Sequence, residues 1–307
     1  MNHYFYKEYS NRTPDSQYQN LLKRIKNEGE KVYSQQQEEA LMVLGHQMRF
    51  ELNNGFPIIS ERDVVSTPEG KKSQFQMALG ELCAFLNGAR TVEEMKEFGC
   101  GWWSRWATKS KCAKRGLETG DLGPGSYGPA WRHFPTSEGN PFDQIKHLIE
   151  QITSLPHLRT HIVTPWIPQY IGRGKGKQQK VVVVPCHGWF HVVINTYTQE
   201  LSLHHFQRSA DAPVGLVFNL IQYAALTMMI AQVTNYTPKR LIYTTSDTHI
   251  FLGQMEAVEE LLSTEPQRLP TVMMNPDVRD LFSFKPEDFS VTDYYPQTGR
   301  KVIWTPV

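Results

Sequence analysis

The chain has 307 residues, of which 40% are hydrophobic and 21% are charged, a composition typical of a globular protein with ample material for a core. Its 32 basic and 31 acidic side chains leave a formal net charge of +1, so we expect neither nucleic acid nor an anionic membrane as a partner. No apolar run approaches the roughly 20 residues that cross a bilayer, and residues 1–15 lack the features of a signal peptide. The four cysteines contain no C-x-x-C pair and are too few for a disulfide scaffold, so we expect a cytoplasmic protein.

The spacing of hydrophobic residues predicts the elements of the first half of the chain. They are a helix over 16–33, a strand over 40–52 that ends at an Asn-Asn-Gly turn, a buried helix over 76–86, a loop-like stretch over 98–135, an amphipathic helix over 142–155 and a short strand over 160–166.

The second half contains more strands and one long apolar helix. We predict a buried strand over 181–184, strands over 189–196, 201–207 and 240–245, a core helix over 216–233, and a helix over 247–262 capped by Ser246 or Asp247. No linker divides the chain, so residues 1–307 are predicted to form one α+β domain whose sheet packs against long apolar helices. Residues 1–15 are an N-terminal extension.

Residues 172–180, GRGKGKQQK, form a glycine-rich basic stretch that we predict to be an exposed loop. A solvated insertion is the plainest interpretation. The alternative is that the loop folds over an anion, because its glycines make it flexible and its cations have no evident partners.

Several residues have side chains suited to chemistry. Cys186 follows four valines and a proline, and a thiol near cations can have a lowered pKa and act as a nucleophile; the alternative is an inert buried cysteine. Arg208 with Ser209 would suit a phosphate, or could form an exposed salt bridge. Asn219, on an apolar helix, could read the edge of a pyrimidine or join two helices. Glu81, on another apolar helix, could shuttle protons because burial raises the pKa of a carboxyl group.

A metal site is the competing interpretation of one region. Cys186 and four histidines occur within a short stretch, and thiolate and imidazole are zinc ligands. The spacing contains neither an i,i+4 helical pair nor a C-x-x-C pair, so we expect no metal. The remaining candidates are the Asp247-Thr248-His249 segment and a group of aromatic residues, which could stack on a heterocycle or fill the core: Trp102, Trp103, Trp106, Tyr127 and Trp131.

Ten short motifs follow one another along most of the chain: GHQMRFEL (45–52), GFP (55–57), GELCAFLNG (80–88), WWSRW (102–106), GDLGPGSYGPAWR (120–132), PCH (185–187), QRSAD (207–211), GLVFN (215–219), SDTHIF (246–251) and YYPQTG (294–299). Together they resemble the thymidylate synthase family. The resemblance implies a homodimer with a six-stranded sheet at its interface. It also implies transfer of a one-carbon unit from 5,10-methylenetetrahydrofolate to C5 of a pyrimidine nucleotide.

By this resemblance, Cys186 attacks C6 of the base, Glu81 is the acid–base group that acts through water, and Tyr127 lies near the proton leaving C5. Asn219 resembles the residue that reads the base at N3 and O4. The residues that resemble nucleotide contacts are Gln207, Arg208, Ser209, His187, His249 and, lent by the other subunit, Arg159. The residues that resemble folate contacts are Trp103, Asp211, Gly215, Phe218 and Val307, and Asp211 is counted with the catalytic group as well.

The chain departs from the family at its expected phosphate site. Gln35 occupies the place of an arginine that grips the phosphate, and Thr160 replaces the second of the paired arginines. Each charge-assisted contact contributes about 1.5–3 kcal/mol, so losing two would weaken nucleotide binding by roughly two to four decades. Phe251 replaces a tyrosine that shares the ribose hydroxyl with His249, and His191 replaces a glutamine. The segment between Trp166 and Cys186 is longer than usual, so its basic loop could replace the lost phosphate contacts or hold the acidic tail of the folate.

Three functions remain open at this stage. The first is a thymidylate synthase that converts dUMP to dTMP, favoured by Trp103, which occupies the place that shields the intermediate from water. The second is a uracil or cytosine nucleotide 5-hydroxymethylase that traps the same intermediate with water. The third is a relative that only binds a nucleotide, against which the presence of Cys186, Glu81, Asn219 and Arg208 together argues. Asn219 favours uracil over cytosine.

Overall fold

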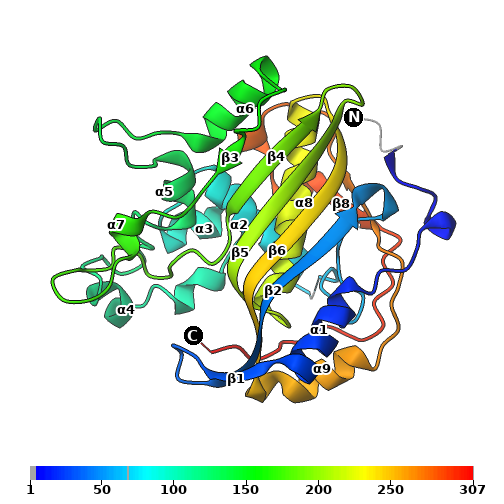
Figure 1. The fold of residues 1–307 in the computed structure, drawn as a ribbon, viewed down its shortest axis with the longest axis horizontal. Coiled ribbons are helices and arrows are strands. Elements are labelled where there is room, and N and C mark those ends of the chain that lie inside the picture. The colour runs from blue at the N-terminus through cyan, green and yellow to red at the C-terminus, as the bar shows by residue number, and fades with distance from the viewer. Residues whose placement is uncertain (1–4, 68, 307) are drawn as a thin grey trace.

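The computed structural model describes residues 5–67 and 69–306, which form a mixed α+β structure built on a six-stranded sheet (Figure 1). The strand order is β1-β2-β6-β5-β4-β3, and every neighbouring pair is antiparallel except β5 and β6. The bounds are β1 Glu30–Tyr33, β2 Glu39–Glu51, β3 Ile162–Val163, β4 Trp189–Asn195, β5 Glu200–Asp211 and β6 Thr237–Phe251. A separate two-stranded sheet pairs β7 (Thr271–Met274) with β8 (Phe289–Thr292).

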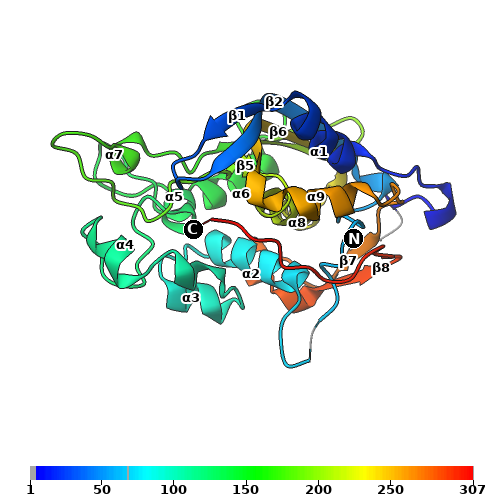
Figure 2. The ribbon, with the colours of Figure 1, turned by 90° about the horizontal axis from the view of Figure 1, so that it is seen from below.

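The parallel pair β5 and β6 is joined by the long helix α8 (Gly215–Val233), because a parallel connection must cross back over the sheet. Helix α8 is apolar on all sides, and it lies between the sheet and helix α2 (Gln74–Leu86) in Figure 2. It is the one described helix long and apolar enough to cross a membrane, yet 94% of its most apolar window is buried inside the protein. The predicted core helices over 76–86 and 216–233 are therefore confirmed.

The remaining helices surround this core. They are α1 Gln17–Glu28, α3 Val92–Glu97, α4 Lys109–Ala113, α5 Tyr127–Arg132, α6 Gln144–Ser154, α7 Pro168–Ile171 and α9 Met255–Leu262. The amphipathic helix predicted over 142–155 is α6, whereas the stretch predicted as a loop over 98–135 contains α4 and α5. The segment before α1 packs on the body through Arg12, which is 4% exposed and donates to the Leu269 carbonyl at 2.9 Å.

The two faces of the sheet differ in their side chains. Phe190, Val192 and Leu203 point to the core and are buried. Alternate residues of these strands point the other way. On that second face Val193, Phe206 and Ile162 remain 38–47% exposed. This alternation is typical of an antiparallel sheet that is covered on one face.

Three sequence predictions were wrong because pairing between distant segments decided the structure. The helix predicted over 16–33 ends at Glu28, and residues 30–33 instead form β1, which pairs with β2. Gly29 lies between them, where a Cβ atom would come within 2.3 Å of the Ile25 carbonyl oxygen.

The helix predicted over 247–262, with a cap at Ser246 or Asp247, begins only at Met255. Strand β6 continues to Phe251 because it is paired on both sides, with β5 and with β2. The strand predicted over 181–184 is absent, and these residues form an irregular wall segment. Its backbone bonds to a distant loop and not to a strand of the sheet: the Val182 N–H donates to the Leu122 carbonyl at 2.9 Å.

Candidate active site

A cavity of about 600 Å³ opens where β5 and β6 meet the first turn of α8, and α2, α5 and the 181–187 segment complete its walls. It brings together almost every residue predicted from the sequence to act on a ligand. The lining residues from that prediction are Glu81, Trp103, Tyr127, Cys186, His187, Gln207, Arg208, Ser209, Asp211, Gly215, Phe218, Asn219 and His249.

Two predicted residues are not in this group. Arg159 is exposed and does not line the cavity, and Val307 lies outside the described residues. Arg159 belongs to the segment just before β3, at the edge of the sheet.

Cys186 is half-buried at the cavity wall. Its backbone N–H donates to the Tyr127 hydroxyl at 2.8 Å, and Arg208 Nη2 lies 3.4 Å from its Sγ. Burial raises the pKa of the thiol, and the nearby Arg208 guanidinium partly offsets that rise. The expectation of a lowered pKa was therefore wrong for the ligand-free site, because desolvation of the thiolate outweighs one cation.

Arg208 is held by the segment that carries Cys186. Its Nε donates to the Pro185 carbonyl at 2.9 Å, and its Nη2 donates to the Val184 carbonyl at 3.0 Å. The backbone N–H of Arg208 also donates to the Cys186 carbonyl at 2.8 Å. These bonds fix the guanidinium beside the sulfur, so Arg208 does not form the exposed salt bridge that was the alternative for it.

Glu81 is buried on α2 and has no charged partner among the described residues. Trp103 Nε1 donates to its Oε1 at 2.6 Å, and Gln222 Nε2 donates to its Oε2 at 2.6 Å. Burial raises its pKa to about 7, although both hydrogen bonds act in the opposite direction. A carboxyl group in this condition can accept and release a proton near neutral pH.

A chain of buried amides connects Glu81 with β5. Gln222 Oε1 accepts from Asn219 Nδ2 at 2.9 Å, and Asn219 Oδ1 accepts from Gln207 Nε2 at 3.1 Å. Gln207 Oε1 in turn accepts from the Tyr243 hydroxyl. The chain fixes the orientation of the Asn219 amide, because each of its polar atoms has a defined partner.

Gln222 and Tyr243 were not among the residues predicted from the sequence. In the sequence, Gln222 is one polar residue of an otherwise apolar helix. Its i,i+3 spacing from Asn219 is a signal that both amides share one face of α8, but its bond to Glu81 depends on how α2 packs against α8.

His187 is buried, and its Nδ1 lies 2.7 Å from the Tyr223 hydroxyl. Burial lowers its pKa to about 3, so the imidazole is neutral. Its ring stacks on Tyr127 at 4.4 Å, and Tyr127 stacks on Phe85 at 4.7 Å. Of the aromatic residues that were candidates for stacking on a ligand, Tyr127 is a cavity wall and Trp131 is fully buried core.

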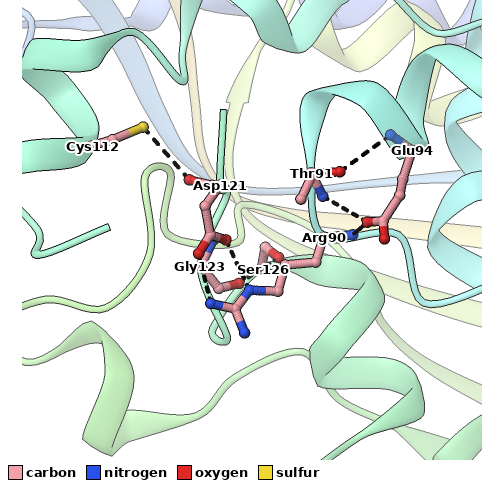
Figure 3. Close-up of polar contacts among 7 residues, drawn as sticks. All are labelled: Arg90, Thr91, Glu94, Cys112, Asp121, Gly123 and Ser126. Atoms are coloured by element: carbon pink, nitrogen blue, oxygen red, sulfur yellow. Dashed lines mark hydrogen bonds and ion pairs between the residues drawn. The ribbon is translucent and has the colours of Figure 1, made fainter. Parts of the chain in front are cut away.

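Tyr127 begins α5 after a turn that is tied at several points (Figure 3). Asp121 forms an ion pair with Arg90 at 2.6 Å, and its Oδ1 accepts from the Gly123 N–H at 2.8 Å. The Ser126 hydroxyl donates to the Gly123 carbonyl at 2.7 Å. These contacts hold the segment that delivers Tyr127 to the cavity.

The end of β6 places a polar cluster at one side of the cavity. Asp247 accepts from the Ser209 hydroxyl at 2.7 Å, and its other oxygen lies 2.8 Å from His249 Nδ1. Phe251 packs edge-on against His249 with ring centroids 4.9 Å apart. The Asp247-Thr248-His249 segment therefore belongs to a strand end and not to the start of a helix.

Trp102 and Phe218 form an aromatic part of the cavity wall. The rings of Trp102 and Phe218 lie 4.8 Å apart. Asp211 is paired with His249 across β5 and β6, and it accepts from the Thr305 hydroxyl at 2.7 Å and from Gln254 Nε2 at 3.1 Å. Burial raises the pKa of Asp211.

The histidines considered as zinc ligands do not converge. His191 and His204 are cross-strand neighbours on the open face of the sheet, whereas His187 and His205 are buried on the core side. Within residues 5–67 and 69–306 no group of three metal-ligating side chains occurs.

The cavity thus joins a thiol beside an arginine, a buried carboxyl group and a line of amides. The chain matches the Thymidylate synthase family over residues 16–304 and therefore belongs to that family. Members of this family are enzymes that modify C5 of pyrimidine nucleotides with methylenetetrahydrofolate.

Proposed function

We propose that this protein transfers the one-carbon unit of 5,10-methylenetetrahydrofolate to C5 of a uracil nucleotide, converting dUMP to dTMP through a covalent adduct with Cys186. The observation that carries the proposal is the arrangement of Cys186, Arg208, Asn219 and Glu81 around one cavity. A protein that only bound a nucleotide would need neither the thiol nor the buried carboxyl group.

Cys186 is proposed to attack C6 of the ring, forming a C6–S bond while the electron pair of the C5=C6 bond moves toward O4. The positive charge of Arg208, 3.4 Å from the sulfur, favours the thiolate that this step requires.

Asn219 is proposed to select uracil. Its Oδ1 has one lone pair left after the bond from Gln207, and its Nδ2 has one hydrogen left after the bond to Gln222. One acceptor and one donor match the N3–H and O4 of uracil, whereas cytosine presents an acceptor and a donor at the same places.

Glu81 is proposed to exchange protons with the base through water, since its pKa of about 7 leaves both forms populated near neutrality. Methylenetetrahydrofolate supplies the carbon unit and, for a methyl product, the hydride that reduces it. The aromatic rings of Trp102 and Phe218 line the cavity, as Asp211 does, and are suited to contact the heterocycle of such a folate.

The second candidate is a 5-hydroxymethyl product, formed when water instead of hydride adds to the methylene carbon. Glu81 supports it, because a carboxyl group with a pKa of about 7 can also take the proton from an attacking water. Trp103 favours the methyl product, because its indole is turned onto Glu81 and excludes water there.

A homodimer formed through the open face of the sheet is part of the proposal. The exposed Val193, Phe206 and Ile162 support it, since several large apolar side chains on one uncovered face mark an interface. Arg159, exposed at the edge of the sheet, would then reach the partner's cavity. Light scattering should give a particle mass of two chains. The Val193→Glu variant should give the mass of one chain, because a buried charge would weaken the interface.

The test of the reaction is incubation with methylenetetrahydrofolate and, separately, dUMP, UMP, dCMP and CMP. Product mass distinguishes a methyl from a hydroxymethyl group. Dihydrofolate appears only when the folate is also the reductant, so its absorbance gives an independent answer. If neither dUMP nor UMP gives a product, the proposal is contradicted.

A further inference from the structure

One end of the cavity carries five cationic side chains, which we call the basic wall: Arg105, Lys111, Lys114, Arg115 and Arg173. The first four come from α4 and its flanks, and Arg173 comes from the loop over 172–180. The two segments lie side by side on the same edge of the molecule (Figure 1), where Arg115 Nε donates to the Val181 carbonyl at 3.0 Å. The sequence predicted the loop but not its neighbour.

The basic wall has no counter-charge. Within the described part of the chain, none of its five cations forms an ion pair within 4.0 Å. The carboxyl groups among the described lining residues are Glu81 and Asp211, and both are bound into networks elsewhere in the cavity. By contrast Lys301, another lining cation, pairs with Glu260.

The cations are held in place and repel one another. Arg115 Nη1 donates to the Lys111 carbonyl at 2.7 Å, and Lys111 Nζ lies 5.0 Å from the centre of the Trp106 ring. Partial burial lowers the pKa of Arg115, and the nearby charge of Arg173 lowers it further. The pKa of Lys111 is lowered in the same way, by partial burial and by the charge of Arg115. An unpaired group of this kind is stabilised when an anion binds between its members.

Arg173 contacts Gln35, the residue that the family resemblance places where an arginine would hold the phosphate. Its Nη1 donates to Gln35 Oε1 at 3.3 Å, and its Nε donates to Gln179 Oε1 at 2.6 Å. Gln35, Arg208 and Ser209 all line the same cavity. The remaining hydrogens of the Arg173 guanidinium and the free amide of Gln35 give a planar set of donors suited to a phosphate oxygen.

We propose that Arg173, supported by Arg115, binds the 5′-phosphate of the nucleotide and so replaces from an inserted loop the charge that Gln35 lacks. The inference rests on the proposed function for the identity of the nucleotide. The rest of the basic wall contributes long-range attraction for the same anion.

The experiment compares two arginine variants with one lysine variant. Arg173→Gln and Arg115→Gln remove cations that line the cavity, whereas Lys177→Gln removes an equally exposed cation of the same loop that does not line it. Calorimetric titrations of each protein use dUMP, deoxyuridine and inorganic phosphate. These measure binding alone and need no turnover.

We expect Arg173→Gln to weaken dUMP and phosphate binding at least tenfold, Arg115→Gln to weaken it less, and Lys177→Gln to stay within twofold of the parent. Deoxyuridine binding should not change in any of them. The double variant Gln35→Arg with Arg173→Gln exchanges the two side chains. It should recover most of the affinity for dUMP, because it places a cation at position 35, in contact with position 173.

Unchanged dUMP and phosphate binding by Arg173→Gln overturns the inference, and so does an equal loss for Lys177→Gln or for deoxyuridine. In a fourth titration with methylenetetrahydrofolate, a variant that loses affinity for the folate alone overturns the inference in favour of the folate's acidic tail. If phosphate binding falls as expected but the parent makes no product from a uracil nucleotide, the phosphate site stands and the proposed reaction fails.

Discussion

The two ends of the cavity are built on opposite principles. Around Glu81, Asn219 and Cys186, polar groups are buried and satisfy one another through Gln222, Gln207 and Arg208. At the basic wall, Arg115 and Lys111 are anchored to backbone carbonyls or an aromatic ring, and none of the five cations has an ion-pair partner among the described residues. The polar groups of the first end satisfy one another, whereas the proposal assigns an anion to the second. Variants at the first end should therefore change the chemical step, and variants at the second should change binding.

The largest effect is expected from Cys186→Ser. A hydroxyl group is a far weaker nucleophile than a thiolate, so turnover should fall by at least about 10⁴-fold. The fold should persist, because Cys186 donates only one weak side-chain bond, to the Val184 carbonyl at 3.6 Å. Turnover of the purified variant with dUMP, beside its thermal unfolding midpoint, checks both parts. Activity within tenfold of the parent would remove Cys186 from the mechanism.

Glu81→Gln should come next, lowering kcat by about 10²–10⁴-fold, the range for loss of one acid–base group. The pH profile sharpens this prediction. The parent should show an ionisation near the pKa of about 7 that burial gives Glu81, and the variant should lack it. A parallel profile in the two proteins would assign that ionisation to another group.

The same shift predicts how stability depends on pH. Burial raises the pKa of Glu81 from its ordinary 4.5 to about 7, so between these values the folded protein holds a proton that the unfolded chain has released. The free energy of unfolding should therefore fall as pH rises through this window, by at most about 1.4 kcal/mol per pH unit from this group. Urea titrations at pH 5, 6 and 7 should show a smaller slope in Glu81→Gln than in the parent. Equal slopes would mean that Glu81 is ionised in the folded state.

Gln222→Leu tests whether the amide chain is part of the catalytic end. It removes the partners of Glu81 Oε2 and Asn219 Nδ2, and each unsatisfied buried group costs about 1–3 kcal/mol. We expect the cost of one such group to fall on the catalytic step and the rest on stability, so kcat/KM should fall about 5- to 150-fold. Gln232→Leu is the matched control, since Gln232 is also buried on α8 but donates to the Asn275 and Val278 carbonyls. Both variants should lose stability, and only Gln222→Leu should move the pH profile. A shifted profile in Gln232→Leu would show a general effect of helix packing.

The smallest of these effects concerns selectivity. Asn219→Asp should shift preference from uracil toward cytosine nucleotides by about tenfold or more, because a protonated carboxyl group can donate to N3 of cytosine and accept from its amine. The ratio of kcat/KM for dUMP and dCMP measures the shift. A constant ratio would leave the base to be read elsewhere, for example by the backbone.

Much of the fold followed from local pattern. The apolar helices over 76–86 and 216–233 and the strands over 189–196 and 201–207 were predicted correctly, because burial on all sides or on alternate residues is written into hydrophobic spacing. The residues gathered at the cavity were also predicted, but through resemblance to a family and not through any single spacing. Residues 30–33 and 247–251 were predicted to be helical from local pattern, but in the structure they belong to strands β1 and β6.

The sequence by itself determined which side chains with chemical potential are present and which helices must be buried, since both follow from residue type and periodicity. Only the tertiary structure decided that Gln222 meets Glu81 across two helices, that burial raises the pKa of Cys186 and not lowers it, and that α4 and the loop over 172–180 form one basic wall. The physical reason is the same in each case. A hydrogen bond, a desolvation energy or a repulsion between cations depends on distances between atoms that lie far apart along the chain, and these distances exist only once the chain has folded.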